Sequence, residues 1–250
     1  PIILTSDPSW GNGEACIYGS ERITEGWKRC TQKDIENIPD FKKIWYIDIG
    51  TQFIPRAIWL IDKGEIKRIH IAREPDWEEE NLWDVHSQWW EWTSTRIERK
   101  RGKWIYGIDK LHLTNPDPNY FKGATVWTEG SSVVGTPFPS KVIKYFPERN
   151  MIYFPGIWFN PPIRHCRYFL ENKIQFLDSP GEYFYAETGP FKGRLYIRLP
   201  GDENPNGKII EVAKYPFLID IKNQSNIEIS GLTFRFSNIM NWMLRWVDTM

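Results

Sequence analysis

The sequence is poor in cysteine, the residue that organises many small secreted folds. Only three cysteines occur, Cys16, Cys30 and Cys166, in no CxxC or metal-ligand spacing. An odd number in this arrangement argues against a disulfide scaffold and against a zinc site. The four histidines are also scattered, without a spacing that would place two of them beside a carboxylate. We therefore expect no metal and no cofactor.

Net charge and long apolar runs are also lacking. Thirty-two basic residues balance thirty-two acidic ones, which disfavours a nucleic-acid partner. No run approaches the roughly 18 apolar residues that a membrane-spanning helix needs, so no membrane span is expected. Pro1 begins inside a predicted strand, PIILTS, without an initiator Met or a signal peptide. We expect the chain to be part of a longer protein.

Aromatic residues are what the sequence has in abundance. There are 14 Trp, 11 Tyr and 14 Phe, together 16% of the chain, alongside 18 Gly and 18 Pro. Aromatic side chains suit pleated, half-buried surfaces, and frequent Gly and Pro separate short strands. The composition predicts an all-β protein.

The pattern along the chain divides it into three parts. Residues 1–40 and 206–250 alternate short strands with turns, and the latter part contains the predicted strands IIEVA, FLIDI, IEISG and LTFRF. Residues 41–205 have a different, tryptophan-rich texture and include a predicted hairpin turn, DKGE, at Gly64. The best helix candidates are PDWEEENLWDVHSQWWEW, residues 75–92, and a shorter piece within 162–178.

Five blocks, taken in order, carry a resemblance to a known family. They are PIILTSDPSWGNGEACIYGSERITEGW, AIWLIDKGEIKRIHIAREPDW, PDPNYFKGATVW, RYFLENKIQFLDSPGEYFYAETGPFKGRLYIRLPGDENPN and SNIEISGLTFRFSN. The chain resembles the N-terminal portion of bacterial right-handed parallel β-helix proteins that include glycoside hydrolases related to fucosidases and xylanases.

The resemblance implies a fold with three parts. The first β-helix coils occupy 1–40, an inserted β-rich, sandwich-like domain occupies 41–205, and the β-helix re-enters over 206–250. It also implies that the catalytic carboxylates lie on coils after the Gly-Leu-x-Phe strand at Phe234, beyond Met250. No catalytic residue is therefore assigned in this chain.

The tryptophan-rich segment is the candidate sugar-binding surface. An exposed indole presents a flat apolar face to a pyranose, and neighbouring polar groups bond its hydroxyls. The predicted carbohydrate-binding residues are Trp89, Trp90, Glu91 and Trp92. Core packing is the alternative for these tryptophans, because most Trp side chains are largely buried.

Two further motifs allow a functional and a structural interpretation. Asp178 and Glu182 could form the acid pair that glycoside hydrolysis requires, but Asp before Ser-Pro-Gly is typical of a turn, and we favour the turn. The basic cluster at residues 96–103 could contact an acidic polysaccharide. A solvated hairpin tip around Gly102 explains it equally well, and we favour the hairpin.

These features predict a secreted bacterial protein, extracellular or at the cell surface, whose partner is a polysaccharide or oligosaccharide. We expect the intact protein to be a glycoside hydrolase, with this chain shaping the substrate groove and inactive alone. A non-catalytic carbohydrate-binding β-helix protein is the alternative. A polysaccharide lyase is a third possibility, although the basic residue and calcium site that lyases use are not evident in the sequence.

Overall fold

The computed structural model describes residues 2–35, 38, 40–77, 83–84, 86–98, 104–129, 137–156 and 166–238. Within these ranges the regular elements are β-strands and short 3-10 helices, so the predicted all-β class is confirmed. No helix in the described part of the chain has the length and apolar character to cross a membrane. The 3-10 helices are η1 (Pro8–Trp10), η2 (Phe41–Lys43), η3 (Pro147–Arg149), η4 (Ile174–Phe176) and η5 (Pro200–Asp202).

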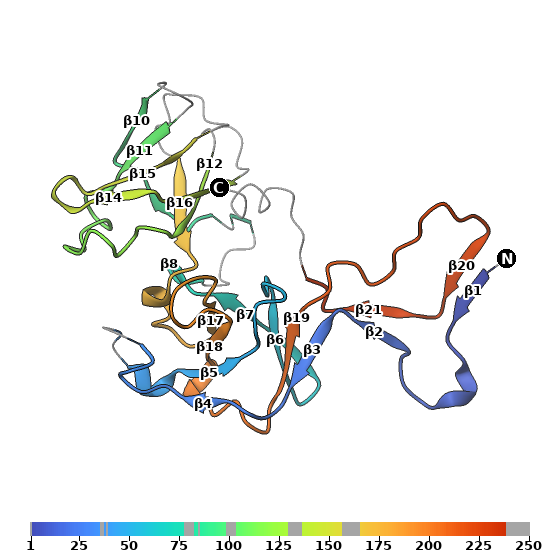
Figure 1. The fold of residues 1–250 in the computed structure, drawn as a ribbon. Helices are drawn as coiled ribbons and strands as arrows, with labels where there is room; N and C mark the ends of the chain where they lie inside the picture. Colours follow the sequence, from blue (N-terminus) through green and yellow to red (C-terminus); the bar gives the residue numbers. More distant parts are fainter. Residues whose placement is uncertain are drawn as a thin grey trace.

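An eight-stranded sheet forms the lower part of the molecule in Figure 1. Its order is β3 (Ser20–Ile23), β19 (Ile209–Ala213), β6 (Ile58–Asp62), β7 (Glu65–Ile71), β17 (Glu182–Tyr185), β18 (Arg194–Arg198), β5 (Trp45–Asp48) and β4 (Lys28–Arg29). Neighbours are antiparallel except β7 and β17, which are parallel. The sheet takes strands from all three predicted segments, and the proposed domain division stays a prediction.

The predicted hairpin at DKGE joins β6 and β7. Asp62 pairs with Glu65, and the two residues between them, Lys63 and Gly64, have φ values of 48° and 86°. Two consecutive positive φ values give the turn whose twist matches that of the flanking strands, and glycine adopts them without steric cost. The hairpin prediction is confirmed.

Two smaller sheets lie above it in Figure 1. One has the order β10 (Ser94–Glu98), β11 (Trp104–Ile108), β15 (Met151–Pro155) and β14 (Lys144–Phe146). The other has the order β13 (Pro137–Lys141), β12 (Thr125–Glu129), β16 (Arg167–Glu171) and β8 (Arg73–Glu74), with β9 (Trp90–Glu91) also on β16. Buried residues of both sheets, such as Ile105, Phe154, Val126 and Tyr168, share one hydrophobic core.

Neither predicted helix is present among the described residues. The first prediction, over 75–92, lies partly outside the described residues, at 78–82 and 85. Its C-terminal end is wrong, because residues 90–91 form strand β9, which pairs with β16 through Trp90 and Tyr168. The second, within 162–178, is wrong because residues 167–171 form β16 and only η4 is helical. In β16, Tyr168, Phe169 and Leu170 are all buried, as in a strand that is covered on both faces.

The beginning of the chain pairs with residues near its end. Strand β1 (Ile2–Thr5) is parallel to β20 (Ile227–Ser230), and β2 (Cys16–Tyr18) is parallel to β21 (Thr233–Arg235), on the right of Figure 1. Side-by-side parallel strands are what neighbouring coils of a β-helix require. Each ladder has two strands among the described residues, so the parallel β-helix itself stays a prediction. The predicted strand FLIDI, residues 217–221, has no strand structure.

Candidate functional site

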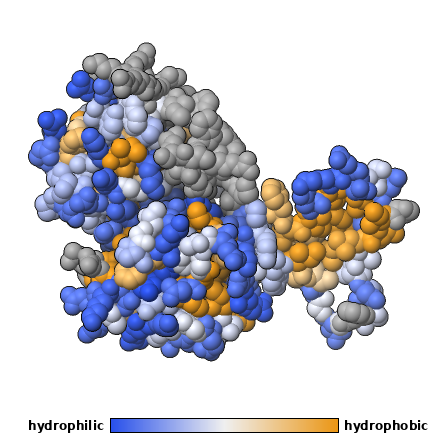
Figure 2. Space-filling model, viewed as in Figure 1, coloured by the Kyte–Doolittle hydropathy of each residue, from blue (hydrophilic) through white to orange (hydrophobic). Residues whose placement is uncertain are grey.

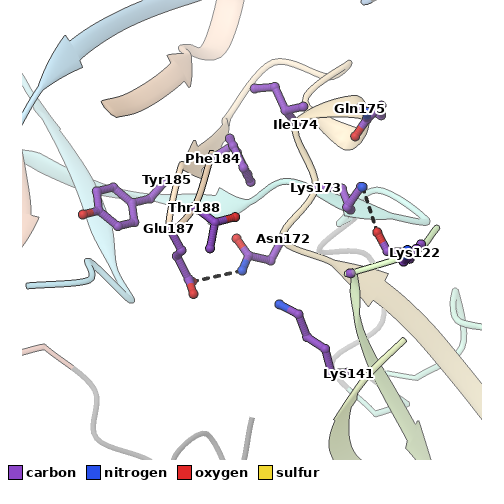
Figure 3. Close-up of a pocket in the computed structure, with 11 residues that line it drawn as sticks. Lys122, Lys141, Asn172, Lys173, Ile174, Gln175, Phe184, Tyr185, Glu187 and Thr188 are labelled. Atoms are coloured by element: carbon purple, nitrogen blue, oxygen red, sulfur yellow. Dashed lines mark hydrogen bonds between the residues drawn. The ribbon is translucent and has the colours of Figure 1, made fainter. Parts of the chain in front are cut away.

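A pocket of about 310 Å³ lies where the small sheets meet the eight-stranded sheet. We call it the junction pocket. Its walls come from the end of β13, from the segment between β16 and η4, and from β17 and the residues after it. Its lining includes Lys141, Asn172, Lys173, Gln175, Phe184 and Glu187 (Figure 3). Pockets of this size between structural units commonly bind small molecules.

Several polar groups around the junction pocket are held in place by the protein. The Lys173 amine donates to the backbone oxygens of Lys122, at 2.9 Å, and of Asn119, at 3.3 Å. The Asn172 amide donates to Glu187 Oε1 at 3.1 Å, and Arg56 pairs with the same oxygen at 3.3 Å. Burial, and then the charge of Lys141, lowers the pKa of Lys173. These contacts fix the walls of the pocket.

Further polar and aromatic groups line the junction pocket. The Gln175 Oε1 oxygen is buried and has no hydrogen-bond partner among the described residues. In Figure 3 the Lys141 side chain extends toward Asn172. Phe184 is partly buried and supplies an aromatic wall, while Thr188 adds a hydroxyl. Hydrogen-bonding groups beside an aromatic ring suit a polar ligand with an apolar face, such as a sugar.

Of the four predicted sugar-binding residues, Trp92 lies in the core. Its side chain is only 3% exposed, and its indole stacks on Tyr168 with 3.5 Å between ring centroids. The indole Nε1 donates to Thr128 Oγ1 at 3.0 Å. Because a protein ring already covers its face, the alternative of core packing describes Trp92.

The other three predicted residues lie closer to solvent. Trp90 is half-buried and stacks on His112, with centroids 4.5 Å apart, and Trp89 is half-buried and stacks on His86 at 4.0 Å. Glu91 is exposed. Each indole therefore has a histidine on one face. Sugar binding by Trp89, Trp90 and Glu91 stays a prediction.

The acidic motif at residues 178–182 is joined by a residue that the sequence did not associate with it. Asp76, which follows β8, contributes a carboxylate oxygen within 4.8 Å of one from Asp178 and one from Glu182. Burial, and then the charge of Asp76, raises the pKa of Glu182 to about 9. These residues do not line the junction pocket.

A second surface hollow, of about 890 Å³, lies beside an aromatic row that the sequence analysis missed. Tyr106 pairs across β11 and β15 with Tyr153, which stacks on Trp104 with centroids 4.9 Å apart. Arg96 and Arg149 line the same hollow. The signal was present in the sequence, because Trp104 and Tyr106 are two residues apart in a strand and share a face.

Comparisons with known proteins find a structural similarity but no match to a family model or a curated protein. No protein-family model matches the chain, and no curated protein matches it. Its structure is similar to a solved structure described as a glycoside hydrolase, with a TM-score of 0.60 and 16% sequence identity over 92% of this chain. The match covers 38% of that protein, so this chain spans less than half of its length. The all-β architecture of this chain is thus shared with a glycoside hydrolase.

Proposed function

We propose that this chain is the N-terminal, carbohydrate-binding part of a glycoside hydrolase that acts on plant or microbial polysaccharide. The main support for the proposal is the structural similarity to a glycoside hydrolase over 92% of the chain. Fold alone does not determine activity, so the chemistry of the surface has to support the same conclusion.

The junction pocket supplies that support. It combines the Lys141 amine, the Thr188 hydroxyl and the Phe184 ring, which together offer a donor, an acceptor and an apolar face. A pyranose presents the complementary set of groups, since it carries hydroxyls around its rim and C–H groups on its faces. We propose that the pocket holds one sugar unit of the substrate.

The proposed catalytic machinery lies outside this chain. The parallel pairing of β1 with β20 and of β2 with β21 supports a β-helix that continues into further coils. General acid catalysis would come from Asp or Glu residues on those coils. We propose that the intact protein is secreted by a bacterium, where polysaccharide is accessible.

Binding of oligosaccharides to the chain tests the proposal. A glycan array identifies a ligand, and isothermal titration calorimetry then compares the wild type with Lys141→Ala, Thr188→Ala and a control, Lys144→Ala. We expect the two pocket variants to bind on the order of tenfold more weakly, because each loses a hydrogen bond worth about 1 to 1.5 kcal/mol. The control lies on β14, outside the pocket, and should bind like the wild type.

Three variants of the other surfaces complete the design. Trp89→Ala and Trp90→Ala test the predicted aromatic segment, and Trp104→Ala tests the aromatic row on β11. If the chain binds no glycan, the proposed carbohydrate-binding role is wrong. If it binds a glycan and only Trp89→Ala or Trp90→Ala weakens binding, the aromatic segment replaces the pocket as the site.

The alternatives differ in what the intact protein does to a bound glycan. A hydrolase releases reducing sugar, a non-catalytic carbohydrate-binding protein leaves the chain length unchanged, and a lyase produces unsaturated ends. Similarity to a glycoside hydrolase favours the first.

A further inference from the structure

Three carboxylates from separate parts of the chain meet beside the first residue of β17. Asp76 follows β8, Asp178 follows η4, and Glu182 begins β17. One oxygen from each lies within 4.8 Å of the other two. Calcium binds oxygen ligands at about 2.4 Å, so two ligands of one ion lie at most about 4.8 Å apart. The spacing therefore allows one ion to contact all three residues.

The Glu182 side chain provides an independent indication of a ligand. It is only 4% exposed, and its Oε1 accepts a hydrogen bond from the Arg73 backbone N–H at 3.2 Å. Its Oε2 is buried without any hydrogen-bond partner in the described part of the chain. Buried carboxylate oxygens are normally paired with a donor or a cation. One oxygen of this carboxylate lies within 4.8 Å of an oxygen of Asp76 and of Asp178.

Two arginines near the three carboxylates, Arg73 and Arg198, interact with other groups. Arg73 Nε donates to the Pro75 carbonyl at 2.8 Å, and its guanidinium lies over the Phe169 ring at 3.9 Å. Arg198 Nε pairs with Asp202 at 2.7 Å, and its Nη1 donates to the backbone oxygen of Asp178 rather than to its carboxylate. Within the described ranges, neither guanidinium forms an ion pair with a carboxylate of the cluster. The three carboxylates therefore lack a bound counter-charge from these side chains.

We propose that Asp76, Asp178 and Glu182 bind a calcium ion, with water completing its coordination. Hard carboxylate oxygens suit calcium, and the site has no thiol or imidazole ligand that would favour a transition metal. Asp76 and Asp178 are exposed, so the ion can enter from solvent. The bound ion would tie the loop after β8 to the turn before β17. The proposal departs from the sequence expectation of no metal, and it is independent of the proposed sugar binding.

Thermal unfolding with and without calcium tests the site directly. The chain is first treated with a chelator and then titrated with calcium chloride to roughly 10 mM, well above the Kd of weak extracellular sites. A ligand that binds only the folded state raises the melting temperature. We expect such a rise for the wild type. We also expect terbium luminescence sensitised by Trp77, which immediately follows Asp76.

Three variants assign the effect to this cluster. Asp178→Asn changes an exposed residue, and Glu182→Gln removes the buried charge while keeping the side chain's shape. Both should fold in chelator and bind calcium on the order of tenfold or more weakly than the wild type. Asp220→Asn, an exposed acid that pairs with Lys222 at 2.6 Å, is the control and should respond like the wild type.

Two results would overturn the proposal. One is a wild-type chain with neither a melting-temperature rise nor terbium luminescence. The other is a calcium response that Asp178→Asn and Glu182→Gln both retain in full. Because calcium binding and glycan binding are measured separately, failure of one leaves the other intact.

Discussion

At the scale of single residues, neighbouring tryptophans have different environments. Trp90 is half-buried on an edge strand, whereas Trp92, two positions later, is 3% exposed and stacked on Tyr168. The sequence could predict that this segment mixes core and surface roles, because Trp89 and Trp90 cannot share one face. It could not predict which indole is covered, since Tyr168 and Thr128 come from distant strands.

The core position of Trp92 leads to a stability prediction at Gly107. A Cβ atom added to Gly107 would lie 2.4 Å from Trp92 Cζ3 and 2.5 Å from Cη2. We expect Gly107→Ala to lower the free energy of unfolding by about 1 to 3 kcal/mol, the usual cost of overpacking. Urea denaturation measures the change. Gly13→Ala is the control, because no atom lies within 4 Å of its added Cβ. Equal stability of both variants would contradict the packing described for Trp92.

His70 leads to a prediction about pH. Burial, and then the charges of Arg68 and Arg73, lowers the pKa of His70 to about 4. The unfolded chain takes up this proton near pH 6.5, whereas the folded chain takes it up only near pH 4. The unfolded state therefore binds more protons between these values, and stability contributed by His70 falls as the pH falls from about 6.5 to about 4.

A variant isolates this contribution from other titrating groups. His70→Phe keeps a ring against Trp77, on which His70 stacks with centroids 5.2 Å apart. Unfolding free energies of both proteins are compared at about pH 7 and about pH 5. The wild type should lose more stability than the variant over this range. An equal loss in both would show that His70 is protonated as readily when folded as when unfolded.

Among the predicted secondary-structure elements, the turn that depends only on neighbouring residues was predicted best. The turn at Lys63 and Gly64 was predictable because its backbone requirement is local. The helix prediction over 75–92 was wrong at its C-terminal end, because Trp90 and Glu91 pair with β16, a strand distant in sequence. Strand FLIDI failed for a related reason, since its alternating pattern has no partner strand in the described part of the chain.

The candidate sites were also only partly predictable from local sequence. The acidic turn at Asp178 and Glu182 was visible in the sequence, but Asp76 joins it only through tertiary structure. The junction pocket was not predicted at all, because its walls come from β13, from residues 172–175 and from β17. Residues that are close in space but far apart in sequence leave no local pattern.

At the scale of the whole molecule, several β-sheets make up the structure, and the strands near the two ends of the described chain expose apolar side chains. Figure 2 shows hydrophobic residues gathered over β1, β20 and β21, and Ile2, Ile3 and Leu4 are all exposed. Parallel strands are usually covered on both faces. This arrangement supports the proposed further coils, which would cover these strands.

The proposed function requires that a sugar binds in the junction pocket. A crystal structure of the chain soaked with its best oligosaccharide is the decisive test of this claim. We predict electron density for a sugar ring against Phe184, with hydroxyls bonded to Lys141 and Thr188. Density for the sugar only at another surface, or an unchanged pocket in crystals saturated with a ligand that binds in solution, would contradict the claim.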